Sequence, residues 1–151
     1  ADRLVVEVPE AARSVGFQPH VVRASTDADL DAAFAALGAM GARGLVIGAD
    51  TFFNSRNDRL AQLAQRHRLV AVSAYREFAT AGGLMSYGGS VKEASRQVGI
   101  YAGRLLKGER PGDLPIQQVS KLDLTVNMKS ASEIGVNIPV ALLARAEEVI
   151  E

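Results

Sequence analysis

The sequence has 151 residues, of which 48% are hydrophobic, with 17 basic and 17 acidic side chains and no cysteine. This length and composition fit one globular domain or a compact part of two, and the zero net charge gives no indication of nucleic-acid binding. The lack of cysteine excludes disulfides and thiolate metal sites, and no apolar run is long enough to span a bilayer.

The first half of the chain alternates helical and strand patterns. Apolar residues at helical spacing predict a helix over 1–15, with a kink or a late start at Pro9, because an internal proline costs a helix about 3 kcal/mol. Two further helices are predicted, one starting after Ser25–Asp27 and ending near residue 40, and one over 56–67 capped by Asn54 or Ser55. Short apolar runs predict strands at Val21–Arg23, Leu45–Ile47 and Val70–Val72. The run G-L-V-I-G at Gly44–Gly48 has no polar side chain, which predicts a strand covered on both faces.

The second half continues the same alternation. A short helix is predicted over 77–81, a strand over 84–87, and a long helix over 91–106 that Ser90 caps. The predicted core face of the long helix consists of Val91, Ala94, Val98, Tyr101, Ala102 and Leu105. After the turn-rich segment 109–115, extended segments are predicted over 116–119 and 122–127, followed by helices over 130–134 and 140–150.

Strands alternating with helices predict an α/β fold, with a Rossmann-like parallel sheet flanked by helices. Such a domain usually opens with a strand, whereas this chain opens with a helical pattern. We therefore expect a strand before Ala1 to be missing, so that the domain is truncated at its N-terminus. An uncovered sheet edge or apolar face invites pairing, which predicts that this chain self-associates as a dimer.

The residues that usually carry catalysis are sparse. The nucleophile elbow, dinucleotide-binding and phosphate-loop motifs are all absent from the sequence. Of the two histidines, His20 opens a predicted strand, and His67 lies near a helix end, where a favourable interaction with the helix dipole explains it. Asp50 and Glu77 could form a carboxylate pair, but no nucleophile accompanies them. We expect no catalytic residue, no metal and no cofactor.

The sequence instead favours a binding site after two neighbouring strands. Asp50 follows one strand and Tyr75 and Glu77 follow the next, so their loops should emerge from one edge of a parallel sheet. Asp50 could pair with a ligand ammonium group, while Ser73 and Ser86 could receive a carboxylate. Apolar walls could come from Phe52, Phe53, Tyr75 and Phe78, with at least one of the first two filling the core instead.

Four segments in order resemble one known family. They are G-A-D-T-F-F-N-S-R at 48–56, R-E-F-A-T-A-G-G-L-M-S-Y-G at 76–88, Y-A-G-R-L-L-K-G-E-R-P-G-D-L-P-I-Q-Q at 101–118 and L-T-V-N-M-K-S-A-S-E-I-G-V-N-I-P at 124–139. The chain resembles the substrate-binding proteins of bacterial ABC importers that include tryptophan- and tyrosine-type amino-acid binding proteins. These look like type I periplasmic binding proteins, in which two Rossmann-like lobes joined by three crossing segments hold a ligand between them.

Family members are about twice as long, so the resemblance implies the carboxyl-terminal half of one. Residues 1–83 would be the second ligand-binding lobe without its first strand, residues 84–120 part of the first lobe, and residues 121–151 the final crossing segment and terminal helices. The ligand-binding positions that follow are Asp50, Thr51, Phe52, Phe53, Ser73, Tyr75, Glu77, Ser86 and Tyr87.

The resemblance further implies an exported protein, periplasmic or attached to the outside of the membrane, that binds an amino acid or related small molecule. Its partners would be that ligand and the ABC transporter permease subunits, with no nucleic acid. Two alternatives remain. One is the effector-binding domain of a transcriptional repressor, which shares the two-lobe architecture; the other is a small α/β enzyme.

Overall fold

The computed structural model describes residues 2–117 and 121–151, with side chains from residue 5 onward in the first helix. Its five strands form one sheet in the order β1-β2-β3-β4-β5. β1 is parallel to β2 and β2 to β3, whereas β3 and β4 are antiparallel and β4 and β5 parallel. The strands are β1 (Gly44–Ile47), β2 (Val70–Ser73), β3 (Met85–Gly89), β4 (Leu122–Asn127) and β5 (Glu148–Ile150). The predicted α/β fold, with a sheet flanked by helices, is confirmed; the sheet is parallel as predicted except between β3 and β4.

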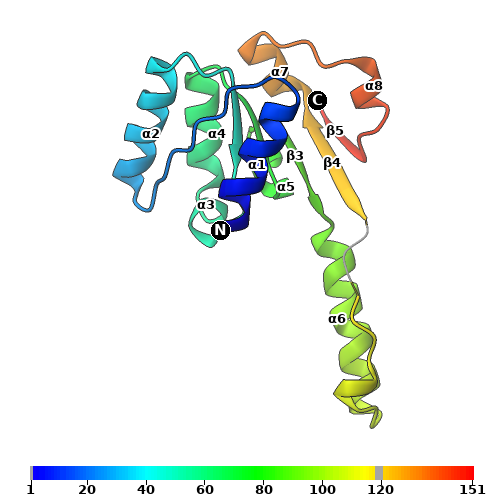
Figure 1. The fold of residues 1–151 in the computed structure, drawn as a ribbon. Coiled ribbons are helices and arrows are strands. Elements are labelled where there is room, and N and C mark those ends of the chain that lie inside the picture. Colours follow the sequence, from blue (N-terminus) through cyan, green and yellow to red (C-terminus); the bar gives the residue numbers. More distant parts are fainter. Residues whose placement is uncertain (1, 118–120) are drawn as a thin grey trace.

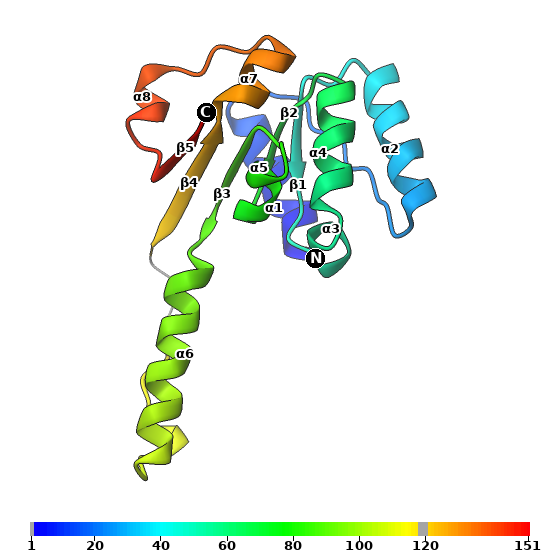
Figure 2. The same ribbon diagram turned by 180° about the vertical axis from the view of Figure 1, so that it is seen from behind.

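Helices cover both faces of the sheet unequally. Figures 1 and 2 show α1 on one face, with α4 and α5 on the other. The helices are α1 (Asp2–Ser14), α2 (Asp27–Ala39), α3 (Thr51–Asn54), α4 (Asn57–Arg66), α5 (Arg76–Thr80), α6 (Val91–Leu106), α7 (Met128–Ile134) and α8 (Val140–Leu143), with the 3-10 turn η1 (Pro111–Asp113). Every helix among the described residues is too short or too polar to cross a membrane.

The main core lies on the face of the sheet that α4 and α5 cover. It joins buried side chains from α2 and α4 to side chains of β1 and β2 and to Phe78 of α5. Its members are Leu30, Phe34, Leu37, Ile47, Leu60, Ala61, Leu63, Ala64, Leu69, Ala71 and Phe78. The apolar spacing of α2 and α4 in the sequence therefore does point to the core.

Capping residues fix where several helices begin. The Thr26 side chain accepts a hydrogen bond from the backbone N–H of Asp29, whose carboxylate accepts in turn from the Thr26 N–H, so the predicted cap of α2 is confirmed. Ser90 caps α6 as predicted. The prediction that Asn54 or Ser55 caps the next helix is wrong, because these residues end the short helix α3, and Arg56 takes the N-cap position of α4.

The predicted strand at Val21–Arg23 is wrong. Residues 17–24 adopt neither helix nor strand, because no strand among the described residues pairs with them. β1 lies at the edge of the sheet, where it pairs with β2 on one side. Its Val46 side chain is 57% exposed, so the prediction that Gly44–Gly48 is covered on both faces is also wrong.

The predicted core face of α6 is not buried in this structure. The helix has the predicted bounds, but it contains no buried residue, and Val91 and Val98 are 58% and 69% exposed. Figure 1 shows α6 running away from the sheet, with the following chain returning alongside it. The Tyr101 hydroxyl donates to the Pro115 carbonyl at 2.6 Å and so ties the returning chain to the helix. Of the segment predicted over 116–119, the first two residues are not in a strand and the rest lies outside the described residues.

The prediction of one final helix over 140–150 is wrong. The structure has the short α8 and then β5, which pairs with β4. The backbone N–H of Glu147 donates to the Leu124 carbonyl at 2.9 Å, and the Glu147 carboxylate accepts from the Leu124 N–H at 2.6 Å. These contacts with a distant strand outweigh the local helical pattern.

Two glycines permit close approaches beside β3. A Cβ on Gly83 would lie 2.2 Å from the Phe78 ring, and one on Gly88 would lie 2.0 Å from the Ala74 carbonyl oxygen. Gly82, just before, has a φ of +100°, a left-handed backbone conformation that glycine adopts readily and that turns the chain between α5 and β3. The glycines thus set how closely β3 packs against β2 and α5.

Candidate functional site

The carboxyl ends of β1, β2 and β3 meet at one edge of the sheet, because these strands are parallel. We call this the carboxyl edge and define it as residues 48–51, 74–77 and 88–91. It contains the start of α3, the start of α5 and the start of α6. Both ribbon views also place the beginning of α1 at this end of the sheet (Figures 1 and 2). In open α/β sheets, ligands bind at such an edge.

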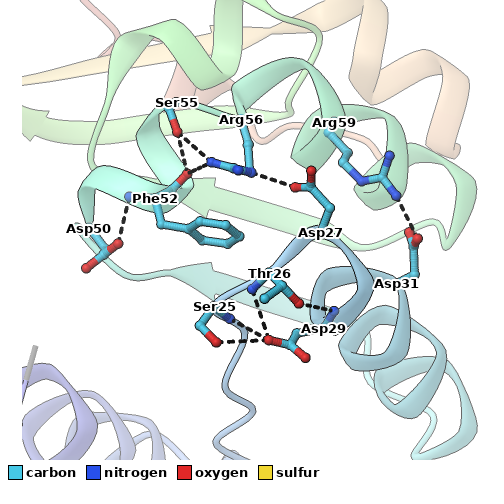
Figure 3. Close-up of polar contacts among 10 residues, drawn as sticks. All are labelled: Ser25, Thr26, Asp27, Asp29, Asp31, Asp50, Phe52, Ser55, Arg56 and Arg59. Carbon is cyan, nitrogen blue, oxygen red and sulfur yellow. Dashed lines mark hydrogen bonds and ion pairs between the residues drawn. The ribbon is translucent and has the colours of Figure 1, made fainter.

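Asp50 is exposed at the carboxyl edge and caps α3. Its Oδ1 accepts a hydrogen bond from the Phe52 N–H at 2.8 Å, and its other oxygen points away from the ribbon (Figure 3). Thr51, the first residue of α3, is also exposed. A carboxylate can accept more than one donor, so Asp50 can cap the helix and still face a positively charged group.

Phe52 and Phe53 are partly buried and pack against the main core. Their rings meet edge to face, with centroids 5.5 Å apart. The Arg56 guanidinium lies 4.0 Å from the centre of the Phe52 ring and forms an ion pair with Asp27 at 2.5 Å (Figure 3). The expectation that at least one of the two phenylalanines serves the core is confirmed, and one face of Phe52 is already taken by Arg56.

The loop after β2 brings Tyr75 and Glu77 to the same edge. The Tyr75 N–H donates to the Ser73 hydroxyl at 3.3 Å, Tyr75 is half-buried, and Glu77 is exposed in the first turn of α5. Between them, Arg76 donates from Nε and Nη2 to the two carboxylate oxygens of Glu148, both at 2.6 Å. That hydrogen bonding lowers the pKa of the Glu148 carboxyl below its usual range and ties the loop to β5.

Ser73 and Ser86 lie side by side inside the sheet rather than at its surface. They are directly paired across β2 and β3, and each is less than 5% exposed. Thr125 of β4 is the next buried hydroxyl in the same row. Tyr87, which points to the opposite face from Ser86, is 49% exposed. Of these positions, only Tyr87 meets solvent as the structure stands.

The start of α6 forms the third part of the edge. Hydrogen bonding from Ser90, and then the nearby Lys121 ammonium, lower the pKa of the Asp123 carboxyl. A hollow of about 360 Å³ opens here, and it is lined by Gly89, Ser90, Val91, Ala94, Ser95 and Val98. A second hollow, of about 340 Å³, is lined mainly by polar groups around Gly82 at the other end of the sheet.

Neither of these two hollows is lined by Asp50, Tyr75 or Glu77. The structure therefore brings the predicted loops to one edge, outside both of these hollows. Among residues 2–117 and 121–151, no group of three or more acidic, histidine or cysteine side chains is placed to hold a metal ion. His67 follows the last residue of α4, and its ring centroid lies 5.8 Å from that of Phe34. Packing against Phe34 therefore explains the position of this histidine.

Two arginine contacts, one in the edge and one just after it, were not anticipated by the sequence analysis. Arg56 and Arg76 each pair with an acidic residue from a distant element, Asp27 and Glu148 respectively. The sequence signal for these contacts is limited to the presence of one arginine in each of the segments 48–56 and 76–88. Their partners lie 29 and 72 residues away along the chain, so neither pairing could be read from local spacing.

Comparisons with known proteins agree with the fold. The model of a family described as ABC transporter substrate binding protein matches residues 3–150. No curated protein matches the chain. A conserved domain protein from Vibrio cholerae is similar over 98% of this chain, with 24% identity and a TM-score of 0.85.

Two other solved structures are similar over 99% of the chain. One is an ABC domain in complex with L-Trp from Streptococcus pneumoniae, with 20% identity and a TM-score of 0.86. The other is a ligand-free, open substrate-binding protein with adhesive properties from Clostridium difficile, with 19% identity and a TM-score of 0.71. The chain spans 50% of the length of each of these three structures.

Proposed function

The chain belongs to the ABC transporter substrate-binding protein family, and from this we propose that it binds a small-molecule solute for a bacterial ABC importer. The observation that carries the proposal is the family match over residues 3–150. A second support is the carboxyl edge, where loops from three parallel strands meet in the arrangement that binds ligands in open α/β sheets. The L-Trp complex among the similar structures supports an amino acid or related compound as the solute.

The proposed contacts are the exposed polar groups of the carboxyl edge. Asp50 would receive the ammonium group of the solute, and Tyr75 would cover its side chain, since one face of Phe52 is occupied by Arg56. Glu77 is exposed on the neighbouring loop and would add a second acceptor. The complete proposed set also includes positions that are buried or partly buried in this structure. It consists of Asp50, Thr51, Phe52, Phe53, Ser73, Tyr75, Glu77, Ser86 and Tyr87.

The proposed division of the chain follows its shape. Residues 1–83 contain the main core and would form most of one ligand-binding lobe. Residues 84–120 contain α6, which leaves the sheet with no buried residue and so would complete a second compact unit. Residues 121–151 would return to the first unit through β4 and β5. The solute would then lie between the two units, in an interlobe cleft at the carboxyl edge.

The family model describes binding proteins, and one similar structure is a complex with L-Trp, so we propose no catalytic step and no cofactor for this chain. The natural partners would be the solute and the permease subunits of the importer. Substrate-binding proteins of this family typically work outside the cytoplasm. We propose a periplasmic location, or an extracellular one attached to the membrane.

Two substitutions of Asp50 separate binding from helix capping. Asp50→Asn keeps an N-cap acceptor and the side-chain shape but removes the charge, whereas Asp50→Ala removes both. A charge-assisted contact is worth about 1.5–3 kcal/mol, so both variants should bind the solute roughly tenfold to a hundredfold more weakly. Only Asp50→Ala should also lose about 1 kcal/mol of stability in the absence of solute, because the α3 cap is lost.

The measurement is titration calorimetry with L-tryptophan and the other amino acids, beside thermal melts without solute. Glu10→Gln is the matched control, because Glu10 is an exposed residue of α1 and its substitution also removes one carboxylate. Unchanged affinity in Asp50→Asn would remove Asp50 from the site. Failure of the unmodified protein to bind any amino acid would reject the proposed solute class.

A further inference from the structure

We propose that Arg76 and Glu148 are positioning residues for the solute site, and that β5 fixes the loop of Tyr75 and Glu77 in place through this ion pair. The inference rests on the proposed function, because it concerns the same carboxyl edge. It gives a part in solute binding to a strand that contributes no residue to that edge.

α5 depends on other elements for its position. It has five residues, which are too few for a helix to be stable alone. Tyr75, at its N-cap position, makes no side-chain capping hydrogen bond. Phe78 anchors the middle of the helix, since its side chain is fully buried in the main core. A single buried side chain does not fix the tilt of a helix around it, so further contacts must set the direction in which the first turn points.

β4 and β5 supply these contacts near both ends of α5. At its start, Arg76 donates to the two carboxylate oxygens of Glu148, both at 2.6 Å. Near its end, the buried side chain of Asn127 in β4 donates from Nδ2 to the Ala79 carbonyl oxygen at 2.9 Å. A bidentate arginine–carboxylate pair restrains direction as well as distance. α5 is thus held at its start, its middle and its end.

The sheet in turn fixes the position of Glu148. This residue pairs with Thr125 of β4 and lies in the same row across the sheet as Ser73, the last residue of β2. The preceding residue, Glu147, makes two hydrogen bonds with the backbone of Leu124, one from its N–H and one to its carboxylate. The Glu148 carboxylate therefore extends from a well-supported backbone towards the start of α5.

The exposure of the pair favours positioning over stabilisation. The side chains of Arg76 and Glu148 are 57% and 37% exposed, and ion pairs as exposed as this contribute little to the free energy of unfolding. A binding site, however, needs its contact residues held to within about 0.5 Å, which supporting hydrogen bonds provide. Losing the pair should therefore disturb Tyr75 and Glu77 more than it disturbs the fold.

The first test is amide hydrogen exchange without solute, comparing Glu148→Gln and Arg76→Gln with the unmodified chain. The reporters are the Tyr75 amide, which donates to the Ser73 hydroxyl, and the Phe78 amide, which donates to the Tyr75 carbonyl. We expect both amides to exchange roughly threefold to tenfold faster in each variant, while the amides of α4 exchange as before.

Glu109→Gln is the matched control. Glu109 also accepts from an arginine, Arg104 of α6, in an ion pair whose side chains are 37% and 42% exposed. This variant should leave both reporter amides unchanged. The double variant with Arg76→Gln and Glu148→Gln should exchange no faster than either single variant, because both substitutions remove the same pair.

The second test is titration with L-tryptophan. We expect Arg76→Gln and Glu148→Gln to bind it more weakly by a similar factor, roughly threefold to thirtyfold. A loss confined to Arg76→Gln would overturn the proposal, because Arg76 would then contact the solute directly. Unchanged exchange at Tyr75 and Phe78 in Glu148→Gln would also overturn it, as would equal acceleration over α4, which indicates a loss of global stability.

The positioning role and the proposed function fail in different ways. If the unmodified chain binds no amino acid, the proposed solute class is rejected, whereas faster exchange confined to the reporter amides still supports the positioning of the loop by β5. If the unmodified chain binds L-tryptophan and Glu148→Gln binds it equally well, the positioning role is overturned and the proposed function stands.

Discussion

Gly88 is the position at which β3 comes closest to the backbone that follows β2, and we predict that Gly88→Ala is strongly destabilising. A Cβ at this position would lie 2.0 Å from the carbonyl oxygen of Ala74, 2.9 Å from its carbonyl carbon and 3.1 Å from its Cα. All three atoms belong to the backbone, so no side-chain rotation can relieve the contact. β3 would have to move away from β2, which would weaken the pairing of Ser86 with Ser73.

The size of the effect follows from overpacking in a well-packed region, which costs about 1–3 kcal/mol. A chain of this length shifts its melting temperature by about 2–4 °C for each kcal/mol, so we expect a fall of roughly 2–12 °C. The assay is urea unfolding followed by far-UV circular dichroism, with thermal melts beside it. The denaturant slope should stay unchanged, because the surface exposed on unfolding is the same.

Gly99→Ala in α6 is the matched control. A Cβ on Gly99 meets no atom within 4 Å, and alanine is favoured over glycine in a helix by about 0.5–1 kcal/mol. This variant should be as stable as the unmodified protein or slightly more stable. The reasoning would be refuted if Gly88→Ala were equally stable while Gly99→Ala behaved as expected.

Two further predictions concern pH and self-association. Arg76 lowers the pKa of the Glu148 carboxyl, so the unfolded chain binds this proton more readily than the folded one. The ion pair therefore stabilises the fold fully above the ordinary glutamate pKa. Its contribution is lost as the pH falls through the lowered pKa. Between about pH 5 and pH 3, Glu148→Gln should therefore lose less stability than the unmodified protein, by at most about 1 kcal/mol for so exposed a pair; identical pH profiles in urea unfolding would contradict this. Val98 is 69% exposed on the apolar face of α6, so we expect the chain to dimerise and Val98→Glu to shift light scattering towards the monomer, with Arg96→Glu as the control. A monomer at high concentration before any substitution would reject the dimer.

Elements whose signals are local could be predicted closely from the sequence. α6 begins and ends where it was expected, because Ser90 caps it and Gly108, with a φ of +98°, ends it. β1, β2 and β4 follow from short apolar runs, and the parallel direction of β1 and β2 follows from the helical connection between them. The direction of β4 does not, because it runs antiparallel to β3 although α6 lies between them. The meeting of Asp50, Tyr75 and Glu77 at one edge rests on the same rule for parallel strands.

What could not be predicted depends on residues far apart in the sequence. Residues 21–23 have a strand pattern, but a strand exists only where a partner supplies hydrogen bonds, and in the part of the chain that the structure describes none pairs with them. β5 forms because β4 is available, although the local pattern favours a helix. The apolar face of α6 predicts that this face is buried, but the pattern does not identify the element that packs against it. In the candidate site, the arginine contacts to Asp27 and Glu148 arise only once the fold has assembled.

The antiparallel pairing of β3 with β4 has a consequence for the order in which the protein folds. The pair aligns Met85 with Val126 and Gly89 with Leu122, so its two strands can meet only after all of α6 and the returning chain have been synthesised. β1, β2 and β3 can pair earlier, since each is separated from the next by a short helical connection. The entropy of closing the intervening loop grows only slowly, by about 0.6 kcal/mol for each doubling of its length. Lengthening the chain beyond α6 should therefore slow the docking of β4 and β5 while leaving the stability of the completed sheet almost unchanged.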